Sequence, residues 1–213
     1  MPLRLHLLRH GQTPTSRDNV FCGAHLDPEL TADGLAMAQA FADAHADAHW
    51  QRIYAGPLQR TQATARIIAD RAGVPFDTRG AITEIDYGRW DGLSADTVDR
   101  EFHDDFVRWT ADPAWNAPTD GETAIALARR MLGVVEEVTQ DVPDGDVLFV
   151  THKASIRALL CTLLGVDVSR FRFRFACPTG SVSVIEFGRR GPLALSIADR
   201  SHLNARLRGA EGT

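Results

Sequence analysis

The sequence has 213 residues, with 23 basic and 28 acidic side chains for a formal net charge of −5, and 44% of its residues are hydrophobic. This composition is typical of one folded domain, residues 1–213, and excludes a disordered, collagen-like or fibrous chain. The acidic balance argues against a nucleic-acid partner, because such proteins normally carry a basic face.

The N-terminal apolar run is interrupted by Arg4 and His6, which is unlike a signal peptide. No stretch approaches the ~18 apolar residues of a membrane span, so we expect no membrane partner. The cysteines form no C-x-x-C pair, which favours reduced thiols and a cytoplasmic location. Whether the protein forms a homodimer is left open by the sequence. The cysteines are Cys22, Cys161 and Cys177.

The first half of the chain predicts a strand, a helix, a second strand and a second helix. The first strand is a short apolar run that stops before Arg9, and Thr31 is a plausible cap for the first helix. Gly73 ends the second helix. These elements cover residues 3–8, 31 to about 50, 52–55 and 59–72.

A helical insertion, about residues 88–122, separates this part from a second set of elements. Its aromatic residues either cap a pocket or form a small core, and the core interpretation is favoured for most of them: Phe102, Phe106, Trp109 and Trp115. A long helix, a strand buried on both faces, a further helix and a hairpin follow at residues 123–139, 147–151, 154–164 and 182–198. Residues 206–213 are interpreted as a frayed tail without a role.

Alternating strands and helices predict a three-layer α/β/α sandwich with a mostly parallel central sheet. Two of its strands end at histidines, His10 and His152, and ligands of open α/β sheets lie beyond these carboxyl ends. Arg9 and Arg60 accompany them, and arginine forks suit tetrahedral oxyanions such as phosphate. Neighbouring positive charge lowers the pKa of an imidazole, so one histidine could be a neutral nucleophile. Glu84 is either a general acid or a surface salt-bridge partner.

Six blocks in order resemble the histidine phosphatase superfamily, also called phosphoglycerate mutase-like. They begin with Leu8-Arg9-His10-Gly11-Gln12-Thr13 and include an acid block that starts at Glu84 and the Val150-Thr151-His152 block. The six cover residues 8–13, 26–34, 57–65, 84–92, 121–123 and 150–160.

The resemblance implies a metal-independent phosphomonoesterase that needs no cofactor and hydrolyses a small phosphorylated metabolite. It implies that His10 becomes a phosphohistidine, that Arg9, Arg60 and His152 hold the phosphoryl group, and that Glu84 donates and then accepts a proton. It also places further residues where the family usually touches phosphate or substrate: Gln12, Ser16, Cys22, Gly23 and Tyr87.

The chain departs from the family pattern at several positions near the expected pocket. Ser16 stands where Asn is usual, Met37 where Gln is often found, and Ala55-Gly56 where Ser-Ser is common. Lys153-Ala154 replaces a common Gly-Gly, and Lys153 is the single lysine among the 23 basic residues. We hypothesise that Lys153 reaches a second acidic group on the substrate; the alternative is a surface lysine that points away.

Three other functions remain open. A cofactor-dependent phosphoglycerate mutase is disfavoured by the short chain and by the acid block, which lacks the usual Glu-Arg-His-Tyr-Gly. A non-catalytic phosphate-binding module is disfavoured because all five candidate catalytic residues are present. A metal site is the third alternative, because His45 and His49 lie four residues apart on a predicted helix, flanked by Asp43 and Asp47; a solvated helix end explains the same residues.

Overall fold

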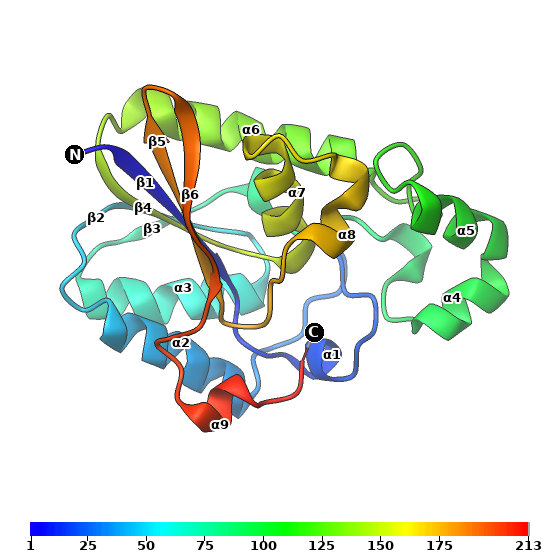
Figure 1. Ribbon diagram of the computed structural model, residues 1–213. Coiled ribbons are helices and arrows are strands. Elements are labelled where there is room, and N and C mark those ends of the chain that lie inside the picture. Colours follow the sequence, from blue (N-terminus) through cyan, green and yellow to red (C-terminus); the bar gives the residue numbers. More distant parts are fainter. Residues whose placement is uncertain (213) are drawn as a thin grey trace.

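A computed structural model describes residues 1–212 and builds them around a six-stranded sheet (Figure 1). The strand order is β3-β2-β4-β1-β5-β6. The first four strands of this order pair in parallel, and β5 pairs antiparallel with both of its neighbours, β1 and β6. The sheet is therefore mostly parallel, as predicted. The strands are β1 (Leu3–Arg9), β2 (Trp50–Ala55), β3 (Phe76–Thr78), β4 (Gly145–Thr151), β5 (Val182–Gly188) and β6 (Gly191–Asp199).

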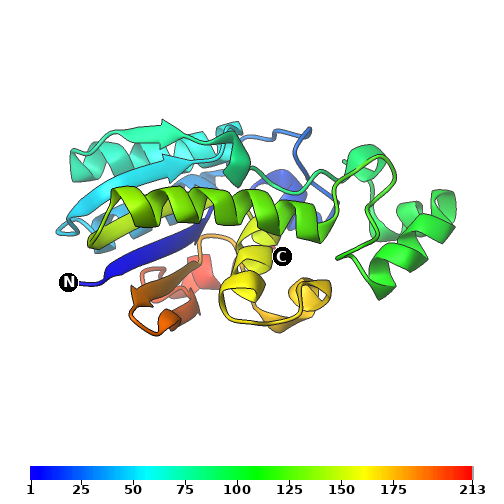
Figure 2. The ribbon, with the colours of Figure 1, turned by 90° about the horizontal axis from the view of Figure 1, so that it is seen from above.

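Helices cover both faces of this sheet (Figures 1 and 2). Helices α6 and α7 bury apolar side chains against one face, and α2 and α3 bury theirs against the other. The three-layer fold is thus confirmed. The helices of the described chain are α1 (Pro14–Arg17), α2 (Ala32–Ala44), α3 (Gln59–Ala72), α4 (Ala95–Glu101), α5 (His103–Ala111), α6 (Ala124–Asp141), α7 (Lys153–Leu163), α8 (Phe171–Arg174) and α9 (Ala205–Arg208).

Strand β4 lies at the centre of the fold, because its side chains alternate between the two cores. Phe149 packs with the α6 and α7 layer, and Leu148 and Val150 pack with the α2 and α3 layer. Its parallel neighbour β1 runs in register with it, so that Arg9 is opposite Thr151. The residues that follow the two strands therefore emerge at the same edge of the sheet.

The insertion lies to one side of the three layers, where α4 and α5 project beyond the sheet (Figures 1 and 2). Trp90, Val98 and Trp109 form its buried core, with Phe102 and Phe106 packed against them. The core interpretation is therefore confirmed for three of the four predicted aromatic residues. Trp115 does not belong to this core, because 74% of its surface is exposed.

Three features of the fold differ from the sequence prediction. The helix that Thr31 caps ends at Ala44 and not near residue 50, because the chain leaves helical geometry at His45 and turns into β2. Strand β3 was not predicted, since its three residues include only one partly buried hydrophobic side chain, Phe76. The expected frayed tail instead contains α9, whose Leu207 is buried.

Leu207 packs with Met37 and Leu203 in a small separate core, which explains why this end of the chain is ordered. The Gln12 side-chain amide also donates a hydrogen bond to the Glu211 carbonyl. Met37, which replaces a common family glutamine, thus serves as an apolar base for α9. Within residues 1–212, no helix has the length and apolar character needed to cross a membrane.

Candidate active site

The two histidines at the strand ends lie against each other. Because β1 and β4 are in register, the backbone N–H of His10 donates to the Thr151 carbonyl at 3.0 Å, and His152 follows directly. The ring centroids of His10 and His152 are 5.2 Å apart, with the planes at 63°. Both side chains are buried, with 5% and 0% exposure. The predicted convergence of two distant parts of the chain is therefore present.

The imidazole of His10 is held in one tautomer. Its Nδ1 lies 2.7 Å from the Gly11 carbonyl oxygen, which can only accept, so Nδ1 carries the proton and neutral His10 has a free lone pair on Nε2. Burial, followed by the charges of Arg60 and Arg9, holds the pKa of His10 well below 6.5. At neutral pH the side chain is therefore uncharged, and its free Nε2 lone pair is available to act as a nucleophile.

Arg9 and Arg60 bring two buried guanidinium groups to the histidines. Nη1 of Arg9 donates to the Cys177 carbonyl at 2.7 Å, and Arg60 donates to the carbonyls of Leu26 and Gly23 at 2.8 and 3.1 Å. These hydrogen bonds fix the orientation of the two guanidinium groups. The Nε atoms of both arginines are buried and have no acceptor within the described chain. Each arginine therefore retains donor capacity for an anion.

His152 is fully buried, and neither of its ring nitrogens has a hydrogen-bond partner among the described residues. Burial and the charges of Arg60, His10 and Arg9 hold its pKa well below 6.5. A Cβ atom built on Gly56 would lie 3.1 Å from Nε2 of His152. The glycine that replaces the common family serine thus stands directly beside this imidazole.

Glu84 is buried at the cavity and forms no salt bridge with any residue of 1–212, so the surface salt-bridge interpretation is not supported. Its carboxylate accepts from the backbone N–H groups of Ile85, Ala154 and Ser155 at 2.9, 3.2 and 3.1 Å, and from the Ser155 hydroxyl at 3.2 Å. The first turn of α7, directly after His152, provides three of these four donors. These bonds hold the carboxyl group in one orientation, as a group that exchanges protons with substrate requires.

Arg130 on α6 clamps the loop that carries Glu84, and the sequence reasoning did not single it out. It donates to the carbonyls of Ala81, Thr83 and Glu84 at 2.6, 2.9 and 2.9 Å. It also forms a two-bond ion pair with Glu122, with both distances at 2.9 Å. Glu122 belongs to the Gly-Glu-Thr block, so the available sequence signal was a glutamate placed just before this helix, where a cationic partner could be sought.

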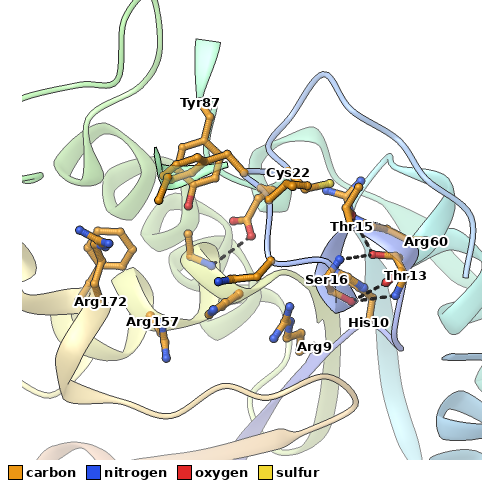
Figure 3. Close-up of a pocket in the computed structure, with 18 of the residues that line it drawn as sticks. Arg9, His10, Thr13, Thr15, Ser16, Cys22, Arg60, Tyr87, Arg157 and Arg172 are labelled. Carbon is orange, nitrogen blue, oxygen red and sulfur yellow. Dashed lines mark hydrogen bonds between the residues drawn. The ribbon is translucent and has the colours of Figure 1, made fainter. Parts of the chain in front are cut away.

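A cavity of about 220 Å³ lies among these groups (Figure 3). His152 is not one of the residues that line it and lies directly behind His10, against which its ring packs. Arg9, His10, Arg60 and Glu84 line it, and so do four of the six residues expected to contact phosphate or substrate: Ser16, Cys22, Tyr87 and Lys153. The alternative for Lys153, a surface side chain that points away, is therefore wrong. Arg157 and Arg172 also line the cavity, although neither was expected to. Trp109 lines the cavity and also belongs to the core of the insertion, so both interpretations of this residue hold.

Gln12 and Gly23 do not line the cavity. The Gln12 side chain turns toward Thr31 and the Glu211 carbonyl. Gly23 acts through its backbone: its carbonyl accepts from Arg60, and its N–H donates to Asp91. A Cβ at Gly23 would lie 2.5 Å from the Ile85 carbonyl oxygen, so the position has no room for a side chain.

Ser16 and Tyr87 contribute hydroxyl groups of different kinds. The Ser16 hydroxyl accepts from the Thr13 N–H and donates to the Thr13 carbonyl, both at 2.9 Å, and so caps the short helix α1. Burial and the nearby Glu84 charge raise the pKa of Tyr87, which keeps its hydroxyl neutral at all working pH values.

The histidine pair considered as a metal site does not share a helix face. His45 lies one residue past the end of α2, where its ring stacks on Phe41 at 4.0 Å, and His49 is exposed in the following turn. Among residues 1–212, no three His, Cys, Asp or Glu side chains are grouped so that they could hold a metal ion.

The fold and the cavity define a class of phosphoryl-transfer protein, and comparison with known proteins identifies the family. The family model of the histidine phosphatase superfamily (branch 1) matches residues 5–200. The chain is 33% identical to phosphoserine phosphatase 1 of Hydrogenobacter thermophilus over 94% of each chain. It is also 33% identical to glucosyl-3-phosphoglycerate phosphatase of Mycolicibacterium vanbaalenii, covering 79% of this chain and 77% of that protein.

A solved structure agrees with this result. The mycobacterial glucosyl-3-phosphoglycerate phosphatase in complex with inorganic phosphate superimposes with a TM-score of 0.83 and 26% identity, over 94% of this chain and 99% of the other. The protein therefore belongs to branch 1 of the histidine phosphatase superfamily, which confirms the resemblance inferred from the six blocks.

Proposed function

We propose that the protein is a metal-independent phosphomonoesterase that hydrolyses a small phosphorylated metabolite through a phosphohistidine on His10. The observation that carries this proposal is the meeting of a neutral, oriented imidazole with two buried guanidinium groups and one fixed carboxyl group at a single cavity. Its relatives named as phosphatases of phosphoserine and of glucosyl-3-phosphoglycerate support the same reaction class.

In the first step, Nε2 of His10 attacks phosphorus; the N–P bond forms as the ester P–O bond breaks. Glu84, in its protonated form, gives its proton to the departing ester oxygen. Arg9, Arg60 and His152 face the phosphoryl oxygens and stabilise the charge that they carry. The Nδ1 proton stays on the ring and donates to the Gly11 carbonyl, whose oxygen stabilises the positive charge that develops on the imidazole.

In the second step, water gives a proton to the Glu84 carboxylate and attacks phosphorus. The P–N bond breaks, inorganic phosphate leaves, and His10 and protonated Glu84 are restored. A mutase would instead keep the phosphoryl group on His10 until a second substrate accepted it. The fate of the phosphoryl group therefore separates the phosphatase from the mutase.

The test is phosphate release from para-nitrophenyl phosphate in EDTA, by wild type, His10→Ala and His49→Ala. Wild type and the exposed-site control His49→Ala should be active, and His10→Ala should lose all measurable turnover. Rapid mixing followed by an alkaline quench should trap a base-stable, acid-labile phosphoenzyme in wild type and His49→Ala but not in His10→Ala. Turnover that survives in His10→Ala, or that EDTA abolishes, would overturn the proposal.

The cellular location that we propose for this activity is the cytoplasm. Cys22, Cys161 and Cys177 are all free thiols in the structure, and free thiols are typical of a reducing compartment.

A further inference from the structure

We propose that the cavity contains a second anion subsite, formed by Lys153, Arg157 and Arg172, and that the substrate is a phosphate monoester carrying a carboxylate. This inference rests on the proposed function, because it describes the part of the cavity beyond the phosphoryl group. It extends the hypothesis about Lys153 to two arginines that only the structure brings to the site.

The three cations come from two helices that face one cavity. Lys153 and Arg157 are one turn apart on α7, so they share a face, and Arg172 comes from α8. In Figure 3, Arg9, Arg157 and Arg172 follow one another along one side of the cavity, with Tyr87 on the other side. The row therefore leads from the phosphoryl end of the site toward the insertion.

The side chains of these three cations have no acceptor group within the described part of the chain. Within residues 1–212, the side chains of Lys153 and Arg157 form neither a hydrogen bond nor an ion pair, and the side chain of Arg172 has only aromatic contacts. Nε of Arg157 and Nη1 of Arg172 are buried without an acceptor. Since buried donors are normally satisfied, these atoms point to a ligand that supplies acceptor oxygens.

The charges lining the cavity are strongly unbalanced. Its cations are the three subsite residues with Arg9 and Arg60, whereas Glu84 is the only carboxyl group that lines it among the described residues. A phosphoryl dianion at His10 would engage the two catalytic arginines and leave the other three uncompensated. A carboxylate is a compact anion with planar geometry that a guanidinium fork can bind through two parallel hydrogen bonds.

The positive charges of this group lower the pKa values of their neighbours. Burial and the charges of Arg9 and Arg157 lower the pKa of Lys153 to about 8. The charge of Arg157 also lowers the pKa of Arg172, although burial is the larger cause. The geometry thus holds like charges close together, and a bound anion would relieve this repulsion.

The insertion fixes the outer member of the subsite. The guanidinium carbon of Arg172 lies 4.0 Å from the centre of the Trp109 ring, and Trp109 belongs to the buried aromatic core of the insertion. This stacking holds the guanidinium in place at a modest energetic gain and leaves its hydrogen-bond donors free. The insertion is therefore part of the device that selects the substrate.

The experiment compares 3-phosphoglycerate with glycerol 3-phosphate, which has a hydroxymethyl group in place of the carboxylate. Wild type should prefer 3-phosphoglycerate in kcat/KM by about 10-fold or more, the value of one hydrogen bond between charged groups. Lys153→Met and Arg157→Met should each remove most of this preference. Arg174→Met, an exposed arginine on the same helix as Arg172, is the matched control and should keep it.

A binding measurement separates the subsite from the chemistry. Calorimetric titration of His10→Ala should show tighter binding of 3-phosphoglycerate than of glycerol 3-phosphate, and Arg157→Met in that background should abolish the difference. Equal binding and equal kcat/KM for the two compounds would overturn the subsite and leave the phosphatase standing. If wild type does not hydrolyse para-nitrophenyl phosphate but His10→Ala still binds 3-phosphoglycerate selectively, only the proposed function is overturned.

Discussion

The clamp formed by Arg130 can be removed without touching the cavity. Arg130→Met keeps an unbranched apolar stem but deletes all five hydrogen bonds to Glu122 and to the loop carbonyls. The carboxylate of Glu122 then remains 18% exposed and without its cation. Arg129→Met, at the exposed neighbouring position on α6, is the matched control.

The expected loss of stability follows from the burial of the ion pair. Breaking a buried ion pair by removing one partner costs about 3–5 kcal/mol. The side chains of Arg130 and Glu122 are 23% and 18% exposed, so water partly compensates and the lower end applies. We therefore expect Arg130→Met to lower the free energy of unfolding by about 3 kcal/mol, which is a large part of the stability of an ordinary domain.

The clamp should also affect catalysis through the position of Glu84. Arg130 holds the carbonyls of residues 81, 83 and 84, so its loss lets the general acid drift from the ester oxygen. An alkyl phosphate has a poor leaving group and needs this proton more than para-nitrophenyl phosphate does. We expect kcat to fall about 10-fold further for glycerol 3-phosphate than for the aryl ester.

Urea unfolding followed by circular dichroism measures the stability, and steady-state kinetics on the two esters measure the catalytic effect. A cycle with Glu122→Gln isolates the coupling within the ion pair, and Arg130→Lys supplies a milder change if Arg130→Met does not fold. The reasoning is refuted if Arg130→Met unfolds at the same urea concentration as Arg129→Met and retains the ratio of kcat for the two esters.

Three further changes test other parts of the structure. Because the pKa of His152 is lowered in the folded state, the unfolded chain takes up a proton on this imidazole at a higher pH than the folded chain does. The free energy of unfolding must therefore fall as pH drops below about 6.5. Urea unfolding from pH 6.5 to 5 should show His152→Asn reducing that slope by about 1.4 kcal/mol per pH unit, and an unchanged slope would contradict the shift. Leu207→Ala should lower the unfolding free energy by about 2–3 kcal/mol in the same assay, whereas no loss would mean that α9 is not packed. A Cβ at Gly11 would lie 2.2 Å from the Gly34 carbonyl oxygen, so Gly11→Ala should lower kcat by about 100-fold, whereas Gly133→Ala, with open space, should not.

Local patterns were sufficient for most of the fold. The bounds of α3 agree with prediction at both ends, because an apolar stripe is terminated by Gly73 in the left-handed region, with φ of 67°. Strand β4 was recognised because a strand buried on both faces is an unbroken apolar run. The position of His10 and His152 at strand ends then implied their meeting, since parallel neighbours end at one edge.

Other parts depend on contacts that no local pattern encodes. Leu207 is one apolar residue in a polar tail, and it becomes part of a core only because α2 presents Met37 to it. Arg130, Arg157 and Arg172 resemble the many other arginines of the chain until the fold gives each one different neighbours. Gln12 lies in a motif beside the nucleophile, yet its side chain turns to the C-terminal segment.

Because β1 pairs with β4, enzymatic turnover depends on the folding of distant parts of the chain and can be used to measure it. Closing a loop of about 140 residues costs considerable chain entropy before any contact at its end is gained, so this pairing adds to the non-local contacts that slow folding. A growing chain that has not yet synthesised and docked β4 possesses a nucleophile without the neighbouring imidazole. Recovery of activity during refolding should therefore follow the completion of the central sheet.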